Sequence, residues 1–545
     1  KTMQGVGGWL ALYILVMIIQ TATNYISAYG ACKAELYIGR DLKRETFNHL
    51  QTLSFSYFNQ NSVGYTHARV MSDTDRIAST LAWGLMEAVW YIAYLLLAIV
   101  MMFVLNWKLA LCVMVIVPVL VISGAYFQKK LVFFHRRVRE QNSKITGAFN
   151  EGITGAKTTK TLVIEDKVEQ EFDDLTGEMK RLSVRAMHFR SVFMSTTAFA
   201  ASIALAIVLW RGGVITRDGV ILIGTLSVFM NYAQGMMEPV QWLVQVMSSL
   251  VNVQVNVERV TRLLETESDV SDTPEVTAKY GDAFHPKKEN WEPLYGDIEF
   301  QDVTFRYPDG SENVLEHFNL KVPQGTNVAI VGETGAGKST LVNLVCRFFE
   351  PTQGRILIDG RDARERSQLW LHSNIGYVLQ TPHLFSGTVL ENLRYGRPDA
   401  TMDEIEAAVK AVSADQIIAR LPDGYNTDIG EGGNTLSTGE KQLLSFARAL
   451  LADPRIFVLD EATSSVDTVT ERLIQDAIEK VMAGRTSFII AHRLSTIRRA
   501  DVILVVHGGK IIESGTHRSL MNAKGAYYQL YTHQYREEQT RSMMD

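Results

Sequence analysis

The stretch Asn327-Val-Ala-Ile-Val-Gly332-Glu-Thr-Gly-Ala-Gly337-Lys338-Ser339-Thr340 decides the fold of the second half of the chain. Its first five residues are predicted to form a buried strand, and residues 339–349 are predicted to form the helix that follows. Between them, glycines let successive backbone N–H groups turn inward at the start of a helix, an arrangement that binds phosphate. We therefore predict a nucleotide-binding loop made of Gly332, Glu333, Thr334, Gly335, Ala336, Gly337, Lys338, Ser339 and Thr340.

Two side chains of this loop have the chemistry that a nucleoside triphosphate requires. Lys338 is expected to reach the β- and γ-phosphates, and the Ser339 hydroxyl is expected to bind Mg²⁺. Tyr307 ends an alternating, strand-like segment over residues 297–307, from which its ring can stack on adenine. An ordinary tyrosine at a sheet edge is the alternative. The predicted ligands are ATP and Mg²⁺.

A second hydrophobic strand ends in two acids, in the order Ile456-Phe-Val-Leu-Asp460-Glu461. Asp460 is expected to hold Mg²⁺ through water, and Glu461 to orient or deprotonate the attacking water. His492 follows a predicted strand over residues 486–490 and is a candidate contact for the γ-phosphate, or else a structural residue. Strands that alternate with helical segments predict an α/β domain over residues 297–545.

The first half of the chain, residues 1–265, is dominated by long apolar runs. Five of them approach the ~20 residues that cross a bilayer: residues 9–29, 85–106, 109–127, 191–210 and 220–240. Short reversals are predicted at Asn106-Trp107-Lys108 and at residues 211–218. The net charge of −5 argues against a nucleic-acid partner. The three cysteines are too widely spaced to suggest a zinc site or a disulfide framework.

Two long polar connections, residues 33–76 and 129–190, are rich in lysine and arginine and are therefore predicted to be cytoplasmic. Neither contains proline, so the spans are expected to continue as helices beyond the membrane. With the first span running inward, Lys1 would lie outside the cell, and we expect a further helix upstream and six spans in all. Residues 266–296, which contain three prolines, are predicted to be a linker.

Two carboxylates, Glu87 and Glu238, fall in or near predicted spans. Because a charge inside the membrane is costly and often functional, Glu238 is a candidate for attracting a cationic cargo. A solvated or paired carboxylate at the cytoplasmic boundary is the alternative.

As a set, these residues resemble the ATP-binding cassette (ABC) family. Leu436-Ser437-Thr438-Gly439-Glu440 resembles the family's signature, and Gln380, Asp460-Glu461, Asp467 and His492 stand in the family's order. The resemblance covers essentially the whole chain, and a membrane half fused before a nucleotide half is similar to ABC exporters. It implies a helical transmembrane bundle of the six-span exporter type, followed by a cytoplasmic α/β P-loop ATPase domain, in a multi-pass protein of the cell membrane. The implied catalytic residues are Lys338, Glu461 and His492, and the implied metal ligands are Ser339, Gln380 and Asp460.

The resemblance also implies a dimer. Residues 61–73 and 150–160 resemble the family's coupling segments, which dock on nucleotide domains. Each ATP would lie between one chain's loop and its partner's signature, where Ser437 and Gly439 would meet the γ-phosphate and Asp467 would join the ATP-binding residues. The signature departs from the family pattern at Thr438 and Glu440, where glycine and glutamine are usual. We expect Thr438 to restrict a glycine turn and Glu440 to add negative charge near the triphosphate. This favours a heterodimer with a second ABC half-transporter over a homodimer.

The function expected from these features is ATP-driven export of amphiphilic small molecules or lipids. A dedicated lipid flippase or peptide exporter of the same architecture is the first alternative. An ATP-gated channel or regulator is the second, and the presence of Glu461 argues against it.

Overall fold

The structure is a computed structural model, and it describes residues 6–460, 468–491, 493–533 and 535. The chain divides into two compact units, one made of residues 1–48 and 64–265 and the other of residues 49–63 and 266–545. Each unit is described by itself.

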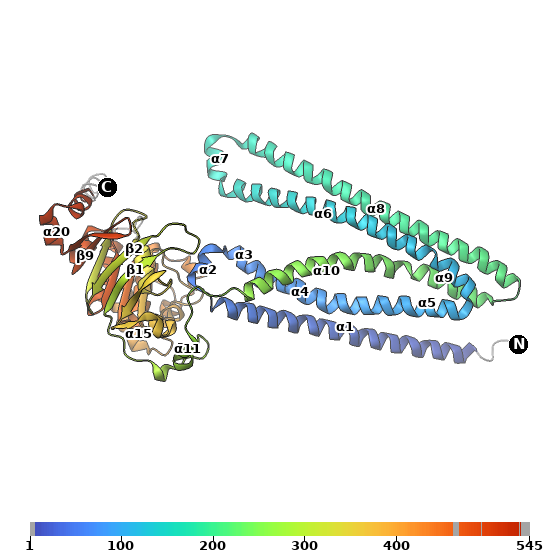
Figure 1. Cartoon of the computed structure of the whole chain (residues 1–545), viewed down its shortest axis with the longest axis horizontal. Coiled ribbons are helices and arrows are strands. Elements are labelled where there is room, and N and C mark those ends of the chain that lie inside the picture. Colours follow the sequence, from blue (N-terminus) through green and yellow to red (C-terminus); the bar gives the residue numbers. More distant parts are fainter. Residues whose placement is uncertain (1–5, 461–467, 492, 534, 536–545) are drawn as a thin grey trace. The chain divides into compact units, whose positions relative to one another are not determined.

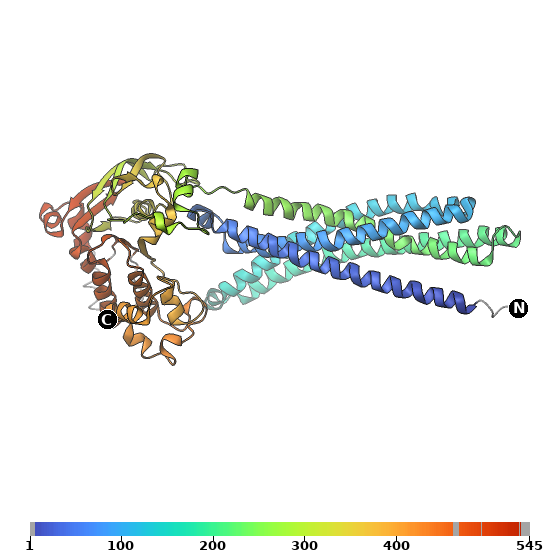
Figure 2. The same cartoon turned by 90° about the horizontal axis from the view of Figure 1, so that it is seen from below.

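The first unit is helical in its described part (Figure 1). Its long helices are α1 (Val6–Leu50), α5 (Leu85–Met114), α6 (Ile116–Thr154), α8 (Glu165–Arg217), α9 (Ile223–Gly235) and α10 (Met237–Leu264). Shorter elements are α3 (Val63–His67), η1 (Ala68–Asp73), α4 (Thr74–Ser79), η2 (Thr80–Gly84) and α7 (Ala156–Leu162). Helices α6 and α8 pack along much of their length (Figure 1 and Figure 2). The predicted continuation of spans as long helices is confirmed.

Within the described residues, three helical stretches are long and apolar enough to cross a membrane: Val6–Leu50, Val63–Met114 and Glu165–Arg217. They contain the predicted spans 9–29, 85–106 and 191–210. The other two predicted spans are each interrupted, at Val115 and at Met236. Prolines explain both breaks, because a proline has no N–H to donate to the carbonyl four residues earlier. For Pro118 that carbonyl belongs to Met114, the last residue of α5, and for Pro239 it belongs to Gly235, the last residue of α9. Six spans therefore stay a prediction.

The predicted reversal at Asn106-Trp107-Lys108 is confirmed. Asn106 leaves the helical conformation (φ −163°, ψ 104°), and its Oδ1 accepts a hydrogen bond from the N–H of Leu109 at 3.1 Å. This side chain therefore caps the helical segment that begins after the turn.

The second predicted reversal, at residues 211–218, is wrong. Helix α8 continues to Arg217, and the chain turns at residues 218–222 instead. Gly212 is needed for close packing rather than for a turn, because a Cβ at this position would lie 2.4 Å from Cδ1 of Leu226 in α9. The glycine lets two helices approach each other and leaves α8 unbroken.

The second unit contains two sheets. A four-stranded antiparallel sheet has the order β2-β1-β4-β5, and a six-stranded, mostly parallel sheet has the order β10-β9-β3-β8-β7-β6. The strands are β1 (Ile298–Phe305), β2 (Leu315–Val322), β3 (Asn327–Val331), β4 (Gln353–Ile358), β5 (Arg361–Asp362), β6 (Ile375–Val378), β7 (Ile456–Asp460), β8 (Thr486–Ile490), β9 (Val502–His507) and β10 (Lys510–Gly515). Strands over residues 455–460 and 486–490 were predicted, and both are present.

The larger sheet lies between two hydrophobic cores. Along β3, Ala329 and Val331 belong to one core, whereas Val328 and Ile330 belong to the other. This alternation is expected of a central strand covered on both faces. The helices of the unit are α2 (Phe55–Gln60), α11 (Pro274–Tyr280), α12 (Lys338–Val345), α13 (Gln368–Ser373), α14 (Val389–Arg394), α15 (Met402–Ala411), α16 (Asp415–Ile418), α17 (Thr438–Leu451), α18 (Thr468–Met482), α19 (Leu494–Arg499) and α20 (His517–Ala523).

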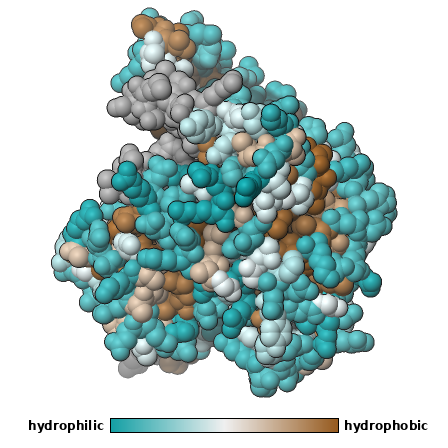
Figure 3. Space-filling model, turned by 90° about the vertical axis from the view of Figure 1, so that its left-hand side faces the viewer, coloured by the Kyte–Doolittle hydropathy of each residue, from teal (hydrophilic) through white to brown (hydrophobic). Residues whose placement is uncertain are grey.

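A helical lobe, coloured orange in Figure 2, lies beside the sheets. The face of the unit that Figure 3 shows is mainly hydrophilic, with scattered apolar residues. Helix α12 ends four residues before the predicted boundary at residue 349. It stops because Arg347 adopts a left-handed backbone (φ 53°) that a helix cannot continue through.

The segment 266–296 is part of the second unit. Val276 and Tyr280 of α11, together with Leu294, are buried in the core that also holds Val328 and Ile330. Asp272 accepts hydrogen bonds from the Arg347 guanidinium at 2.9 Å and from the N–H of Gln368. This segment therefore contributes side chains to the core of the domain that follows it.

Candidate functional site

The predicted phosphate loop lies between β3 and α12. Gly332, Gly335 and Gly337 all have positive φ angles, of 153°, 83° and 102°. At Gly332 a Cβ would lie 2.2 Å from the carbonyl oxygen of Val506 in β9, so no larger residue fits there. Glu333, Thr334 and Gly335 are exposed at the tip of the loop, whereas Ala336 is buried beneath it. The loop therefore presents backbone N–H groups at the start of a helix, which is the geometry of an anion site.

The side chain of Lys338 folds back onto the backbone of this loop. Its ammonium donates to the carbonyl oxygens of Gly332 at 2.9 Å and Glu333 at 2.8 Å, and the residue is 8% exposed. Burial lowers the pKa of the ammonium, and the negative charge of Asp460 opposes that shift. Because an ammonium has three N–H bonds, one remains for a phosphate oxygen at the mouth of the loop.

Asp460 ends β7, two strands away from β3 in the sheet, and its register partner is Ile490 at the end of β8. The carboxyl ends of these parallel strands meet at one edge of the sheet, where α/β proteins bind their ligands. Asp460 therefore lies at the same edge of the sheet as the phosphate loop, which follows β3. Glu461, Asp467 and His492, which were predicted for this site, lie outside the described residues.

Tyr307 follows β1 and is half-buried. Its hydroxyl shares a hydrogen bond with Oγ1 of Thr340 at 2.9 Å, and its ring meets the rings of Phe305 and Phe349 edge-on. These contacts fix the ring beside the first turn of α12. Ser339, in the same turn, is exposed and available to a ligand.

The segment that resembles a signature starts α17. Ser437 precedes the helix, and its Oγ accepts a hydrogen bond from the N–H of Glu440 at 3.3 Å. In return, Oε2 of Glu440 accepts from the N–H of Ser437 at 2.8 Å, which completes a capping box. Gly439 is buried, whereas Ser437 and Thr438 are exposed.

The expectation that Thr438 would restrict a glycine turn is wrong. Thr438 is the first residue of α17, and a helical backbone is open to any L-residue. The departure from the usual signature therefore lies in the charge of Glu440, not in backbone strain at Thr438.

Comparisons with known proteins agree with this geometry. Residues 2–240 match the model of the ABC transporter transmembrane region, and residues 315–464 match that of the ABC transporter. The chain is 34% identical over 521 residues to YgaD of Bacillus subtilis, a protein whose name refers to multidrug export, covering 96% of this chain and 88% of the relative.

It is also 36% identical over 498 residues to an ATP-dependent lipid A-core flippase of Desulfotalea psychrophila, covering 91% of this chain and 84% of the relative. The chain belongs to the ABC transporter family. A solved structure of a bacterial Atm1-family ABC exporter with ATP bound superimposes with a TM-score of 0.77 at 27% identity, covering 95% of this chain and 88% of that one.

Membership of the ABC family confirms several predictions. The protein is a multi-pass membrane ATPase that couples ATP hydrolysis to export, and its α/β domain binds ATP in the cytoplasm. The helical domain followed by a nucleotide-binding domain is the fold of the Atm1-family exporter.

The nucleotide-binding unit of this ABC transporter also contains an aromatic cluster that was not predicted from the sequence. The Phe348 ring stacks on Phe55 of α2 with centroids 4.1 Å apart, and it also contacts His372 and Tyr377. Tyr377 lies in β6, three residues before Gln380, which is exposed. The run Ser54-Phe-Ser-Tyr-Phe58, just ahead of the predicted coupling segment 61–73, was the available signal.

Most of the predicted coupling segment 61–73 belongs to the helical unit. From Gly64 onward it belongs to the helical unit, where Arg69 and Asp73 form an almost buried ion pair at 2.6 Å. Helix α2 is therefore the part of this region that belongs to the nucleotide-binding unit, where Phe55 stacks on Phe348.

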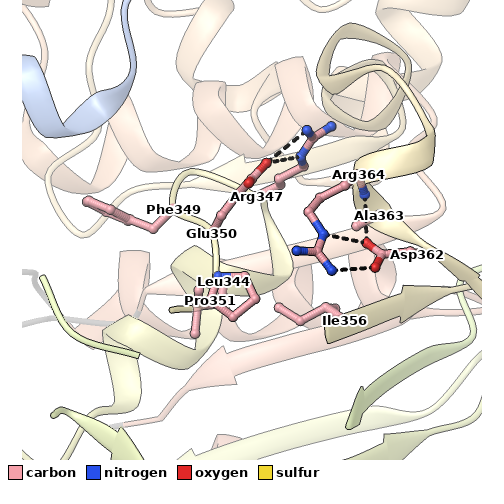
Figure 4. Close-up of a pocket in the computed structure, with 9 residues that line it drawn as sticks. All are labelled: Leu344, Arg347, Phe349, Glu350, Pro351, Ile356, Asp362, Ala363 and Arg364. Carbon is pink, nitrogen blue, oxygen red and sulfur yellow. Dashed lines mark hydrogen bonds and ion pairs between the residues drawn. The ribbon is translucent and has the colours of Figure 1, made fainter. Parts of the chain in front are cut away.

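A small hollow lies beside the end of α12 (Figure 4), and the residues that line it include none of the phosphate loop. Figure 4 shows that its charged residues pair with one another, Arg347 with Glu350 and Arg364 with Asp362. These charges are matched within the protein, so the hollow is not a second phosphate site.

Proposed function

We propose that this chain is one half of an ATP-driven exporter of amphiphilic small molecules or lipids, and that it works with a different ABC half-transporter. The names of the relatives, one for multidrug export and one for a lipid A-core flippase, support this range of cargo. The capping box at Ser437 supports the heterodimer, because it holds the Glu440 carboxylate beside Ser437, the residue that in our proposal meets the γ-phosphate of the ATP held by the partner.

The proposed ATP site uses residues from several elements. Lys338 and the N–H groups of Gly332–Thr340 hold the phosphates, Tyr307 stacks on adenine, and Ser437 and Gly439 are offered to the ATP held by the partner. Asp467 belongs to the same interface. Glu461 orients or deprotonates the attacking water, and His492 contacts the γ-phosphate.

The residues present fit Mg²⁺, which prefers oxygen donors. The Asp460 carboxylate lies at the same sheet edge as the phosphate loop, and the Ser339 hydroxyl is exposed in the first turn of α12. Ser339, Asp460 and Gln380 would hold the ion, which would neutralise charge on the phosphates when bound.

We propose that Glu440 makes the two ATP sites of the dimer unequal. The substitution Glu440→Gln in the intact complex tests this. Glutamine can cap Ser437 in the same way but carries no charge. A pair of like unit charges about 4 Å apart costs roughly 1 kcal/mol in bulk water and roughly 4 kcal/mol near a protein surface, so the site completed by this signature should turn over ATP at least about fivefold faster. Glu391→Gln is the matched control, because Glu391 makes the same capping box with Thr388 in α14. Equal ATPase rates in wild type and Glu440→Gln would contradict the proposal.

Intact-complex mass measurement after purification from the native membrane tests the partner directly. A complex that contains this chain and one other ABC half-transporter is expected. A complex that contains only this chain would refute the heterodimer.

Glu461→Gln separates an exporter from an ATP-gated channel or regulator. In an exporter the substitution should abolish steady-state ATPase activity and net transport. A gate driven by ATP binding would keep working, and that result would overturn the proposed function.

A further inference from the structure

Helices α6 and α8 form an antiparallel pair whose register is set by aromatic contacts. The rings of Phe127 and Phe193 lie 5.6 Å apart, and those of Phe134 and Phe189 lie 5.1 Å apart. As α6 advances from the first pair to the second, α8 runs back toward its own start. Residues at the same height on the two helices can therefore be identified.

The membrane boundary on this pair follows from the helix rise. Trp107 follows the turn at Asn106, and Trp210 lies seven residues before the end of α8. Both are exposed, as expected of interfacial tryptophans that anchor a span. About 20 residues of helix cover the ~30 Å hydrocarbon core. Counted inward, the core ends near Phe127 on one helix and Arg190 on the other, which agrees with the register of the Phe127–Phe193 contact.

Just beyond this boundary the two helices carry only positive charge. Residues 129–139 and 180–190 contain nine lysines and arginines and no aspartate or glutamate. We call these nine side chains the basic belt; they are Lys129, Lys130, Arg136, Arg137, Arg139, Lys180, Arg181, Arg185 and Arg190. All of them are exposed, and none forms an ion pair with another described residue.

The rest of the hairpin has the opposite charge. Residues 140–179, which form the far end of α6, α7 and the start of α8, contain nine carboxylates and four lysines. The basic belt is therefore a local feature of the membrane-proximal section. An excess of lysine and arginine on the cytoplasmic side is enough to orient the spans. Orientation does not require that the basic residues lie next to the membrane and the acidic residues farther away.

We propose that the basic belt binds the headgroups of anionic phospholipids in the cytoplasmic leaflet. Lys129, Lys130 and Arg190 stand at headgroup depth, and the other members lie within about 15 Å of it along the helices. Long side chains extend back toward the headgroups. An anionic surface attracts cations within about a Debye length of 8–10 Å. Anionic lipid would also offset the mutual repulsion of nine uncompensated charges on two packed helices. This proposal does not depend on the cargo or on the composition of the dimer.

Native mass spectrometry tests it on the intact complex, purified in mild detergent and mixed with equal amounts of phosphatidylglycerol and phosphatidylcholine. We expect wild type to retain phosphatidylglycerol preferentially and to lose the preference in high salt. Each cation near an anionic surface is worth roughly a fivefold preference. Arg136→Gln/Arg139→Gln/Arg181→Gln/Arg185→Gln should therefore lower the ratio of the two lipids by at least about tenfold. The variant leaves five members of the basic belt to preserve topology.

Two controls separate local binding from general loss of charge or fold. Lys144→Gln/Lys157→Gln/Lys160→Gln/Lys167→Gln removes four charges from the far end of the hairpin and should leave the ratio unchanged. Arg→Lys replacements at the four belt positions keep the charge and should keep the preference. Equal retention of both lipids by wild type, or equal loss in the two Gln variants, would overturn the proposal. Lipid retention requires no ATP turnover, so a failure of the export function would show separately, in transport assays.

Discussion

The buried guanidinium of Arg347 provides the sharpest test of how the nucleotide-binding domain is stabilised. It is 3% exposed and donates to Glu350 at 2.9 and 3.1 Å, to Asp272 at 2.9 Å and to the carbonyl oxygen of Arg366 at 2.7 Å. Replacing Arg347 with methionine keeps most of the volume but leaves two half-buried carboxylates without their cation. Removing one partner of a buried ion pair costs about 3–5 kcal/mol.

This cost should be visible in thermal unfolding of the full-length protein in detergent. For a domain of this size, 1 kcal/mol corresponds to about 2–4 °C, so Arg347→Met should lower the Tm by about 10 °C. The relevant transition is the one that ATP shifts upward, because ATP stabilises the domain that binds it. Arg499→Met is the control: Arg499 pairs with Glu479 on the surface, with 54% of its side chain exposed, and its loss should cost less than about 1 kcal/mol. If both variants have the same Tm, the Arg347 network does not stabilise the domain.

Three further predictions concern the ATP site and its surroundings. Phe55→Ala should reduce substrate-stimulated ATPase activity more than basal activity, whereas Phe58→Ala, whose side chain is equally exposed at 49% on the same helix, should not. Equal effects of the two substitutions would exclude a special role for the Phe55–Phe348 stack. Tyr307→Ala should raise the Kd for ATP roughly 5- to 100-fold through loss of stacking, whereas Tyr307→Phe, which loses only the bond to Thr340, should raise it by less than about tenfold. Equal Kd values of the two variants, measured by equilibrium binding of a fluorescent ATP analogue, would show that the ring does not stack. Burial lowers the pKa of His372, so the unfolded state binds the proton more readily and stability should fall as pH drops below about 6.5. His372→Gln should therefore flatten the dependence of Tm on pH between about 7.5 and 5.5, and an unchanged slope would exclude His372 as the source of that dependence.

The parts of the site that depend on local sequence were predictable. The strand β3, the glycine loop and the strand β7 ending at Asp460 lie where the sequence placed them, because each is defined by a short run of residues. The contacts of Phe348 with Phe55 and of Arg347 with Asp272 join positions far apart in the chain, and no local pattern marks them. The early end of α12 depends on a left-handed backbone at an arginine, a conformation that is uncommon outside glycine.

Thr438 shows a different kind of error, since the signal was present in the sequence. Ser437 and Glu440 have the Ser-x-x-Glu spacing of a capping box, which places Thr438 at the first helical position. The interpretation as a glycine turn came from the family pattern instead of from these residues. Where a family motif and a local physical signal disagree, the local signal was the better guide to the backbone.

The capping box also shows why Glu440 bears on the partner. In the described part of the nucleotide-binding unit, Thr388, Thr401 and Ser437 all start helices with the same reciprocal bonds to a glutamate, so the box is an ordinary way to begin a helix here. Glutamine satisfies the same geometry, so helix stability does not require a charge at residue 440. The carboxylate nevertheless occupies the N–H of Ser437 at the positive end of α17, which is where an incoming phosphate would be attracted. In the proposed dimer, an ATP completed by this signature would compete with that carboxylate, whereas an ATP held on this chain's own loop would meet the signature that the partner supplies. A dimer of this chain with a different half-transporter is the simplest arrangement in which one of the two ATP sites escapes this competition.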